Sequence, residues 1–308
     1  MRIYCQSSMR KNKIAVIILN YFGDEDTIEC LESLSKFSSG ESIEIYVVDN
    51  GSSADISLAD NKACNFIYIK NEVNLGFAEG NNVGIRRALA NNVDFILLLN
   101  NDTVLIDNSI FVLAEKLMGE KDLGIGGIVN YYYSDPEKLW QAGCINNFIT
   151  TTPKPITKFD AKIDNLTYVD YIPGASMLIK SEVLNKIGLL DDRYFAYYEE
   201  YDFCQRAKKA GYGIAFLQNS KILHKVGKSS PSKVKQYLRT RNGMIFYSMH
   251  ANLFSVCIVA MKNIFKGTVM SIKNRSMDMI KVTLRGVVDY RRKKFGTGSL
   301  AKLLSNKK

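Results

Sequence analysis

The fold of this chain is decided by the stretch FILLLNND, which occupies residues 95–102. Its five consecutive apolar residues predict a strand buried on both faces, because a strand with one face in water would alternate apolar and polar side chains. The polar triplet Asn100-Asn101-Asp102 ends this strand. Ligands of open α/β sheets bind beyond the carboxyl ends of the strands, so the triplet is a first candidate for function.

Upstream of this stretch, strands and helices are predicted to alternate. Three further apolar or β-branched runs predict strands at 14–19, 43–48 and 66–70. Between them, residues 24–37 carry apolar side chains at helical spacing, and 74–84 form a Gly/Asn loop that runs into a helix. This alternation predicts an α/β fold with a parallel sheet. Two of the strands also end in polar pairs, Asn20-Tyr21 and Asp49-Asn50, at the same edge as the triplet.

An acid-rich segment lies in the second half of the chain, after a short helix predicted at 181–187. Residues 197–202, YYEEYD, place three carboxylates among three tyrosines. If a helix follows over 203–210, the acids lie at its N-terminus, where the helix dipole favours negative charge. The tyrosines favour a second interpretation, in which an enclosed carboxylate has a raised pKa and acts as a general base. Glu199 and Glu200 compete for that role.

Three other side chains each allow a structural and a functional interpretation. Asp102 could cap a turn, or it could bind a divalent cation such as Mg²⁺, which takes carboxylate and phosphate oxygens. His224 follows an apolar pair, which favours a structural imidazole over a metal ligand. Asp49 could cap its own turn or accept the ring N–H of a pyrimidine base.

Charge is distributed unevenly along the 308 residues, whose net charge is +10. Residues 1–220 hold 21 basic and 29 acidic side chains, a net −8, whereas residues 221–308 hold 20 and 2, a net +18. Such a tail points to an anionic partner, either a nucleic acid or a membrane surface. Because its basic residues are interleaved with Leu, Ile, Val and Met, the tail favours a membrane surface and argues against nucleic acid.

The apolar run at 244–261 is interrupted by polar residues, so it predicts helices that lie at the bilayer interface and not a transmembrane anchor. The N-terminal apolar run is only six residues long, too short for the core of a secretion signal, and the expected location is therefore the cytoplasm. The six cysteines show no CxxC pattern, which argues against a zinc site and against a disulfide framework.

Together these segments resemble the family 2 glycosyltransferases of the GT-A fold, particularly the bacterial rhamnosyltransferase-like members. The matching segments keep the family's order and spacing: VIILNY (16–21), VVDNGS (47–52), NLGFAEGNN (74–82), LLNND (98–102), PGA (173–175), residues 195–206 and His224. The resemblance implies a Rossmann-like mixed sheet flanked by helices. It divides the chain into an N-terminal extension at 1–13, a GT-A catalytic domain at 14–230 and a basic, amphipathic, membrane-associated helical tail at 231–308.

The resemblance also implies roles for individual positions in binding the donor. Asn20 and Asp49 would line the nucleotide base site, and Asn74 with Gly76 would lie near the ribose and the sugar. The triplet Asn100-Asn101-Asp102 stands at the family's D-x-D motif with only the last acid present. Asp102 would therefore carry most of the contact with Mg²⁺ or Mn²⁺.

For the chemistry, Glu199-Glu200 stands where the family usually has Glu-Asp, which makes Glu200 the expected base. His224 matches a position that approaches the metal or the diphosphate. Arg241 would reach the donor phosphates through its forked guanidinium.

The implied activity is an inverting transfer of a sugar from a nucleotide-diphosphate donor to a hydroxyl group, in cell-surface glycan synthesis. Rhamnose from dTDP-rhamnose is the favoured donor and a UDP-hexose the runner-up. The acceptor would be a lipid-linked oligosaccharide or a polysaccharide, which implies an enzyme on the inner face of the cell membrane. The apolar faces of the tail would also allow a homodimer. The alternative is a catalytically inactive nucleotide-sugar-binding module, which the incomplete D-x-D favours and the carboxylate at 200 opposes.

Overall fold

The structure is a computed structural model that describes residues 11–38, 40, 42–52, 64–226 and 232–300. The N-terminal extension expected at 1–13 therefore lies mostly outside the described residues, as does the last part of the expected tail, 301–308.

The first half of the chain alternates strands and helices as predicted. It contains β1 (Lys13–Asn20), α1 (Asp24–Phe37), β2 (Ser42–Asp49), β3 (Ile67–Lys70), α2 (Gly76–Leu89), β4 (Phe95–Asn100), β5 (Thr103–Leu105) and α3 (Ser109–Gly119). The boundaries of α1 agree with the sequence prediction, and the four predicted strands differ from it by at most one residue at either end.

The second half is richer in short strands. It contains β6 (Leu123–Tyr132), β7 (Asp135–Gln141), β8 (Cys144–Ile145), β9 (Lys154–Pro155), β10 (Leu166–Tyr168), β11 (Ser176–Lys180), α4 (Ser181–Ile187), the 3-10 helix η2 (Asp192–Tyr194), α5 (Glu199–Lys209) and β12 (Gly213–His224). Three helices follow: α6 (Ser232–His250), α7 (Leu253–Lys273) and α8 (Asp278–Arg291).

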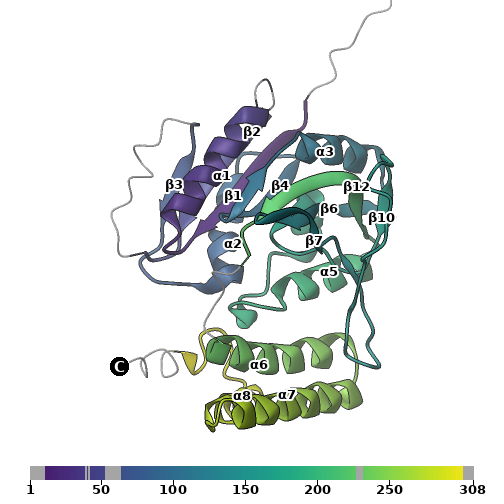
Figure 1. Cartoon of the computed structure of the whole chain (residues 1–308). Helices are drawn as coiled ribbons and strands as arrows, with labels where there is room; N and C mark the ends of the chain where they lie inside the picture. Colours follow the sequence, from purple (N-terminus) through teal and green to yellow (C-terminus); the bar gives the residue numbers. More distant parts are fainter. Residues whose placement is uncertain (1–10, 39, 41, 53–63, 227–231, 301–308) are drawn as a thin grey trace, which may run out of the picture.

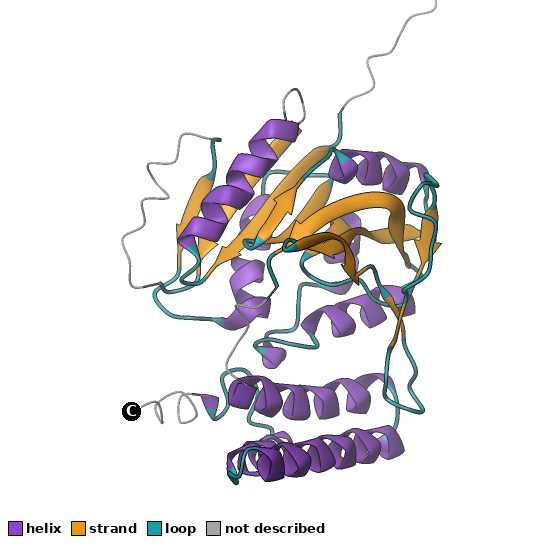
Figure 2. Cartoon of the chain, in the orientation of Figure 1, coloured by secondary structure: helices purple, strands orange, loops and turns teal. Residues whose placement is uncertain are grey.

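A mixed sheet forms the centre of the molecule (Figure 2). Its main path runs β10-β12-β6-β11-β4-β1-β2-β3. The strands β4, β1, β2 and β3 are mutually parallel, as the alternating pattern predicted. β11 then enters between β4 and β6 and runs antiparallel to both, which makes the sheet mixed. As a result, the beginning of β11 lies beside the end of β4.

Both faces of the sheet are covered by helices, and β1 shows why. Ile14, Val16 and Ile18 belong to one buried cluster with side chains of α1 and α3. Ala15 and Ile17 point to the opposite face and join a second cluster with α2, α4 and α5. A strand that is apolar at every position can pack against a helical layer on each face of the sheet, because successive side chains point to opposite faces.

Helices α6, α7 and α8 form a further layer beyond α5 (Figure 1). Side chains of α6 and α7, including Phe246 and Val259, form one buried cluster with Tyr194, and Tyr198 and Tyr201 pack against it. The apolar run at 244–261 is split, because α6 ends at His250 and α7 begins at Leu253. By length and composition α7 is able to cross a membrane, and only 22% of that apolar stretch is buried inside the protein.

Candidate active site

The carboxyl edge of the parallel strands gathers the polar residues that follow them. Asn20 is opposite Asp49 in the pairing of β1 with β2, and Leu19 is opposite Asn100 in the pairing of β1 with β4. Because the three strands run in the same direction, their polar ends share one edge of the sheet.

Asp49 is fully buried at this edge, and both of its carboxylate oxygens accept hydrogen bonds. Oδ1 accepts the backbone N–H of Ser52 at 3.0 Å, and Oδ2 accepts the hydroxyl of Tyr68 at 2.9 Å. These two bonds fix the orientation of the carboxylate. Each oxygen keeps a second lone pair with which it can accept another N–H.

The loop that precedes α2 is tied to the end of β2. Asn50 Nδ2 donates to Asn74 Oδ1 at 3.1 Å and to the Gly76 carbonyl at 2.9 Å. Gly76 has φ +84°, and a Cβ there would lie 2.3 Å from the carbonyl oxygen of Phe195. Only glycine is compatible with both conditions. The same Phe195 carbonyl accepts the Phe77 N–H at 2.6 Å, so this loop contacts the segment that leads to the acid-rich helix.

Asn20 and Asn101 are joined in one hydrogen-bond network at the start of α1. Asn101 Nδ2 lies 3.0 Å from Thr27 Oγ1, 3.1 Å from the Gly23 carbonyl and 3.3 Å from Asn20 Oδ1. Asn20 Oδ1 also accepts the Gly23 N–H, and Asn20 Nδ2 donates to Asp24 at 2.8 Å. The side chains of both residues thus hold the turn between β1 and α1.

Asp102 contacts His224. The distance between Asp102 Oδ1 and His224 Nε2 is 3.0 Å. The backbone brings them together, because the short strand β5, which begins at Thr103, pairs with the end of β12 at His224. The imidazole is buried, with the Trp140 ring edge-on at 4.4 Å between centroids. Its Nδ1 has no hydrogen-bond partner.

The Asp102–His224 pair fits a divalent cation that also binds a substrate. A carboxylate oxygen and an imidazole nitrogen are both metal ligands, and Nε2 is the ring nitrogen that faces Asp102, so Nε2 and the carboxylate are the two atoms that could share a cation. The unpartnered, buried Nδ1 points away from Asp102 and takes no part in that site. Within the described part of the chain, no group of three or more His, Cys, Asp or Glu side chains could hold a metal ion. Phosphate oxygens of a donor would therefore have to complete the coordination.

Lys225, the residue after His224, helps to fix the position of the Asp102–His224 pair. The Lys225 ammonium bridges Asp26 and Glu29 of α1, with Nζ 2.7 and 2.6 Å from their carboxylates. The backbone N–H of Lys225 donates to the Asp102 carbonyl at 2.9 Å. Although burial disfavours the lysine's charge, the hydrogen bonds and charges of the two carboxylates outweigh it and raise the pKa of Lys225. The end of β12 is thereby tied to the N-terminal turn of α1.

Glu200 lies in the first turn of α5, which begins one turn earlier than the predicted helix. A Cβ added to Gly174 would lie 2.9 Å from Glu200 Oε1 and 3.1 Å from the Phe77 ring, so the carboxylate rests against the bare backbone of residue 174. Burial raises the pKa of Glu200, although the backbone N–H of Gly174 partly offsets that effect. The side chain is half-buried.

Glu199 is more deeply enclosed than Glu200. Only 2% of it is exposed, and its Oε2 has no hydrogen-bond partner. Burial, and after it the charge of Glu200, raises the pKa of Glu199 well above its ordinary value. Two adjacent carboxylates in an enclosed place cannot both ionise easily, so the pair holds a proton more tightly than isolated glutamates do.

The segment before α5 has an unusual backbone. Phe195, Tyr197 and Tyr198 have φ of 65°, 68° and 81°, in the left-handed region that favours glycine. Each such residue costs about 1–3 kcal/mol and persists only where surrounding contacts hold it. Asn242 of α6 supplies those contacts, because its Nδ2 lies 2.8 Å from the carbonyl oxygens of Tyr194, Ala196 and Tyr197.

Arg241 takes part in the same support and is itself fully buried. Its guanidinium donates to the carbonyl oxygens of Tyr194 at 3.0 Å, Gly296 at 2.7 Å and Arg193 at 3.3 Å. Sequence reasoning expected this side chain to reach the donor phosphates. The structure directs its donors to backbone carbonyls, including two at the start of the strained segment.

Two connections between distant segments escaped the sequence analysis. His250 Nε2 of α6 lies 2.7 Å from Asp202 Oδ1 of α5. Asp202 Oδ2 also accepts Arg206 Nε at 2.7 Å, a local contact one turn along α5. Burial opposes the charge of Asp202, but the hydrogen bond from His250 and the charge of Arg206 outweigh it and lower the pKa of Asp202. The role of Asn242 was also missed. No local pattern marks either contact, since the partners are more than forty residues apart.

Comparison with known proteins relates this chain to glycosyltransferases. The family model for "Glycosyl transferase family 2" matches residues 15–188. The low-salt glycan biosynthesis hexosyltransferase Agl10 of Haloferax volcanii is 30% identical over 221 residues, which cover 68% of this chain and 66% of that protein. The chain thus spans slightly less than two thirds of that relative. The dTDP-rhamnosyl transferase RfbF of Shigella flexneri is 23% identical over 65% of this chain and 69% of that protein.

Among solved structures, the mannosyltransferase PcManGT from Pyrobaculum calidifontis, in complex with GDP-Man and Mn²⁺, superposes with a TM-score of 0.58. It covers 93% of this chain and 89% of that chain at 11% identity, so the likeness concerns the fold. That fold is the GT-A arrangement implied by the sequence resemblance. Since the family model spans more than half of the chain, this protein belongs to family 2 of the glycosyltransferases.

Proposed function

We propose that this protein is a metal-dependent, inverting glycosyltransferase that moves a sugar from a nucleotide-diphosphate donor to an acceptor hydroxyl. One observation carries the proposal: the Asp102–His224 pair and Glu200 belong to neighbouring strand ends. Asp102 follows β4, and Glu200 rests on Gly174, two residues before β11. The Ala175 carbonyl accepts the Asn100 N–H at 3.0 Å, which joins these two segments directly.

In the proposed reaction, Glu200 is the general base. It is half-buried, and its raised pKa makes it a stronger base than an exposed glutamate. It would take the proton from the acceptor hydroxyl, whose oxygen attacks the anomeric carbon as the nucleoside diphosphate leaves. A single displacement inverts the configuration at that carbon. Glu199 is almost fully enclosed, and its strongly raised pKa would keep it protonated, so it would not touch the acceptor.

Asp102 and His224 would hold Mg²⁺ or Mn²⁺ together with the donor diphosphate. When bound, such an ion stabilises the negative charge that grows on the leaving diphosphate. Asp49 would accept an N–H of the nucleotide base, and Asn74 with Gly76 would line the ribose and sugar. Asn20, Asn100 and Asn101 would shape this site mainly by fixing the loops at the sheet edge.

The donor we favour is dTDP-rhamnose, with a UDP-hexose as runner-up. The similarity to a dTDP-rhamnosyl transferase supports rhamnose, whereas the similarity to a hexosyltransferase supports the broader choice. The acceptor we propose is a lipid-linked oligosaccharide or a polysaccharide under synthesis on the cytoplasmic face of the cell membrane. An exposed apolar helix in a strongly basic tail supports that location.

The test is release of nucleoside diphosphate from a panel of nucleotide sugars, with and without lipid-linked acceptors. We expect turnover with Mn²⁺ or Mg²⁺, its loss in EDTA, and a fall of about 100-fold or more in kcat for Glu200→Gln, the usual size of a lost general base. Glu115→Gln, on the exposed surface of α3, is the matched control and should retain full activity.

Binding of a nucleotide sugar without turnover under any metal condition would favour the inactive binding module instead. Such a result would agree with the asparagine at position 100 of the D-x-D motif. Full activity of Glu200→Gln would remove the proposed base from the mechanism.

A further inference from the structure

Helix α7 is apolar on two opposite faces, and the protein covers only one of them. Val256, Val259 and Gly267 belong to the covered face, which packs against α6 and α8. Gly267 approaches α8 so closely that an added Cβ would lie 2.5 Å from Thr283 Oγ1. This face accounts for the apolar residues that a helix of a soluble protein needs.

The opposite face forms an apolar stripe, which consists of Phe254, Met261, Phe265 and Ile272. Spacings of seven, four and seven residues place these side chains on one side of the helix. Each is between 61% and 74% exposed. Single exposed apolar residues are ordinary, but four large ones in line along 21 residues mark an interaction surface.

Positive charge flanks the apolar stripe. Lys266 and Lys273 lie exposed along one edge of it, seven residues apart. Lys262 lies on the same edge, but its Nζ donates to the Thr150 carbonyl and the Thr152 hydroxyl. On α8, Lys281 and Arg291 share a face with exposed Leu284 and Val288, whose spacings of three and four residues place them in one row.

Negative charge is nearly absent from this surface. Within 232–300 the two acidic residues are Asp278 and Asp289. Asp278 is paired with Lys233 at 2.6 Å, and Asp289 is only 1% exposed. The partner of the apolar stripe must therefore combine an apolar interior with a negatively charged border.

We propose that the apolar stripe of α7 docks the protein on an anionic phospholipid bilayer, with the helix lying in the plane of the membrane. The stripe would enter the boundary between headgroups and acyl chains, and the flanking lysines would contact lipid phosphates. This inference rests on the proposed function in one respect: a lipid-linked acceptor gives the enzyme a reason to be there.

Contacts along the whole of α7 explain why it would lie flat instead of crossing the bilayer. Near its start, Ser255 Oγ donates to the Phe148 carbonyl at 2.7 Å. In its middle, Gln236 Nε2 of α6 donates to the Asn263 carbonyl at 3.2 Å. A transmembrane orientation would break these contacts and would expose the covered face to lipid.

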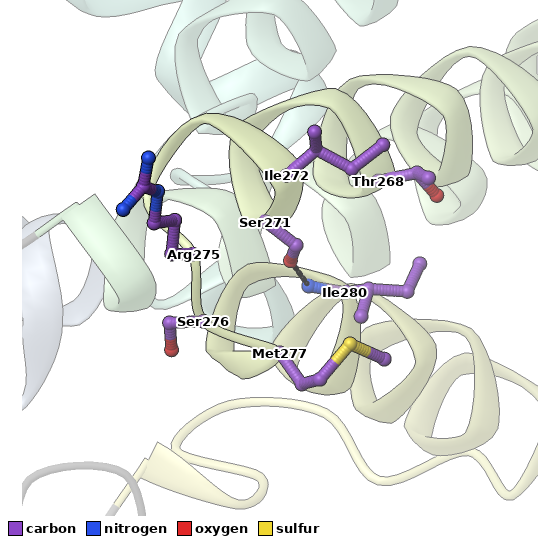
Figure 3. A pocket seen from close by; sticks show the side chains of 7 residues that line it. All are labelled: Thr268, Ser271, Ile272, Arg275, Ser276, Met277 and Ile280. Carbon is purple, nitrogen blue, oxygen red and sulfur yellow. Dashed lines mark hydrogen bonds between the residues drawn. The ribbon is translucent and has the colours of Figure 1, made fainter.

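The last turn of α7 is held in the same way, beside an open groove. Thr268, Ser271 and Ile272 of α7 line it together with Arg275, Ser276, Met277 and Ile280 (Figure 3). Ser271 Oγ accepts the Ile280 N–H at 2.9 Å, which joins the end of α7 to the start of α8. The volume of the groove is about 530 Å³. The groove continues the apolar stripe from Ile272 toward Met277, so the docking surface extends from α7 onto the start of α8.

The first experiment is sedimentation of the full chain with vesicles of phosphatidylcholine alone or with 30% phosphatidylglycerol, in the absence of any sugar donor. We expect binding to the anionic vesicles that weakens in high salt. Phe265→Glu/Ile272→Glu should lower the partition coefficient roughly tenfold or more, because two charges would enter the apolar boundary. Met118→Glu, on an exposed site of α3, is the matched control and should bind like the unmodified protein.

Circular dichroism and melting temperature show whether the double variant is folded. If it is not, Lys266→Glu/Lys273→Glu provides the second test, with Lys121→Glu as its control, because reversing charge on the flank should weaken only binding to anionic vesicles. Failure of the unmodified protein to bind anionic vesicles would overturn the proposal. The proposal would also be overturned if the unmodified protein formed a stable dimer and did not bind vesicles, and if the double substitution dissociated that dimer.

Depth measurements test the orientation. A fluorophore is placed at Phe254→Cys or Ile272→Cys in a Cys257→Ser background, and quenching by lipids labelled at known depths is compared. The two sites are 18 residues apart, about 27 Å along a helix. Equal shallow depths support a helix in the membrane plane, whereas depths that differ by most of that length would overturn it.

Vesicle binding without any sugar transfer would refute the proposed function alone, and transfer without vesicle binding would refute only this inference.

Discussion

At the residue scale, the chain shows how neighbouring carboxylates acquire different properties from their surroundings. Glu199 and Glu200 are adjacent in sequence, yet one is enclosed with an unpartnered oxygen and the other rests half-buried against a glycine. The acid-rich segment by itself left both as candidate bases, and the family resemblance implied Glu200. The half-buried position favours Glu200, because a base must reach its substrate.

The first prediction concerns the stability contributed by Glu199. Its pKa is raised by burial and by the charge of Glu200, so the folded protein binds this proton more tightly than the unfolded chain. Stability should therefore fall as pH rises from the ordinary value of 4.5 through the raised pKa, by about 1.4 kcal/mol for each unit of difference. Glu199→Gln removes this cost.

We expect Glu199→Gln to raise the melting temperature at pH 8, by roughly 2–4 °C for each kcal/mol, and to give little gain at pH 4. Thermal unfolding across this pH range is the measurement, and Glu115→Gln is the control. A lower melting temperature of the variant at pH 8 would show that the ionised carboxylate stabilises the fold.

At the element scale, α6 supports the segment that positions the acids. Asn242 and Arg241 donate to backbone carbonyls of residues 193–197, and three residues of the stretch 195–198 have left-handed backbone angles. An aromatic sequence such as FAYY does not predict such angles, because bulky residues disfavour them. The strain is maintained by a helix that follows nearly forty residues later.

The second prediction is that Asn242→Ala impairs catalysis more than donor binding. Its loss should cost about 1–3 kcal/mol of stability, because several buried carbonyls lose a donor. Relaxation of the strained segment would move Glu200, and we expect kcat to fall about 10- to 100-fold with the KM for the donor little changed.

Steady-state kinetics over a range of pH checks this prediction. The acid limb of the rate profile should also shift, since a displaced Glu200 would be less buried. Ser248→Ala is the control, because the Ser248 hydroxyl bonds to the Ile245 carbonyl within α6, and it should change neither kcat nor the acid limb of the rate profile. An unchanged kcat in Asn242→Ala would show that the strained segment does not depend on this side chain.

At the scale of the whole molecule, the tail and the GT-A part share buried contacts. Asp202 of α5 is fully buried between Arg206 and His250, the last residue of α6. Tyr194 and Phe246 lie in one buried cluster. We therefore propose that the division into a catalytic domain at 14–230 and a tail at 231–308 describes a change in composition and charge, and that the two parts do not fold independently.

The third prediction tests this connection with His250→Ala. Loss of the hydrogen bond to Asp202 should lower the free energy of unfolding by roughly 1–3 kcal/mol at neutral pH, while Arg206 still balances the charge. Because the pKa of Asp202 is lowered from 3.8, this contribution is present above that pH and is lost as pH falls through the lowered value. Denaturant unfolding at pH 7 and pH 3 measures it.

Lys209→Ala is the matched control, because the lysine contacts the same imidazole from its exposed side at 3.0 Å. An exposed contact of this kind should contribute less than about 1 kcal/mol. Equal destabilisation by the two variants would assign the effect to the surface contact and not to the buried pair.

The sequence by itself determined the local elements and the residues at their ends. Apolar runs and helical spacing depend on neighbours within a few positions, so the boundaries of α1 and α4 and the polar ends of β1, β2 and β4 followed from them. The motifs also indicated the GT-A fold and family 2, which the comparisons confirmed.

Only the tertiary structure decided which of these ends meet. The antiparallel entry of β11 beside β4 brings Gly174 and Glu200 toward the strand end that carries Asp102, and the pairing of β5 with β12 joins Asp102 to His224. It also directed Arg241 to backbone carbonyls and left one apolar face of α7 uncovered. These outcomes depend on the path of the chain over forty to two hundred residues, and local periodicity contains no information about that path.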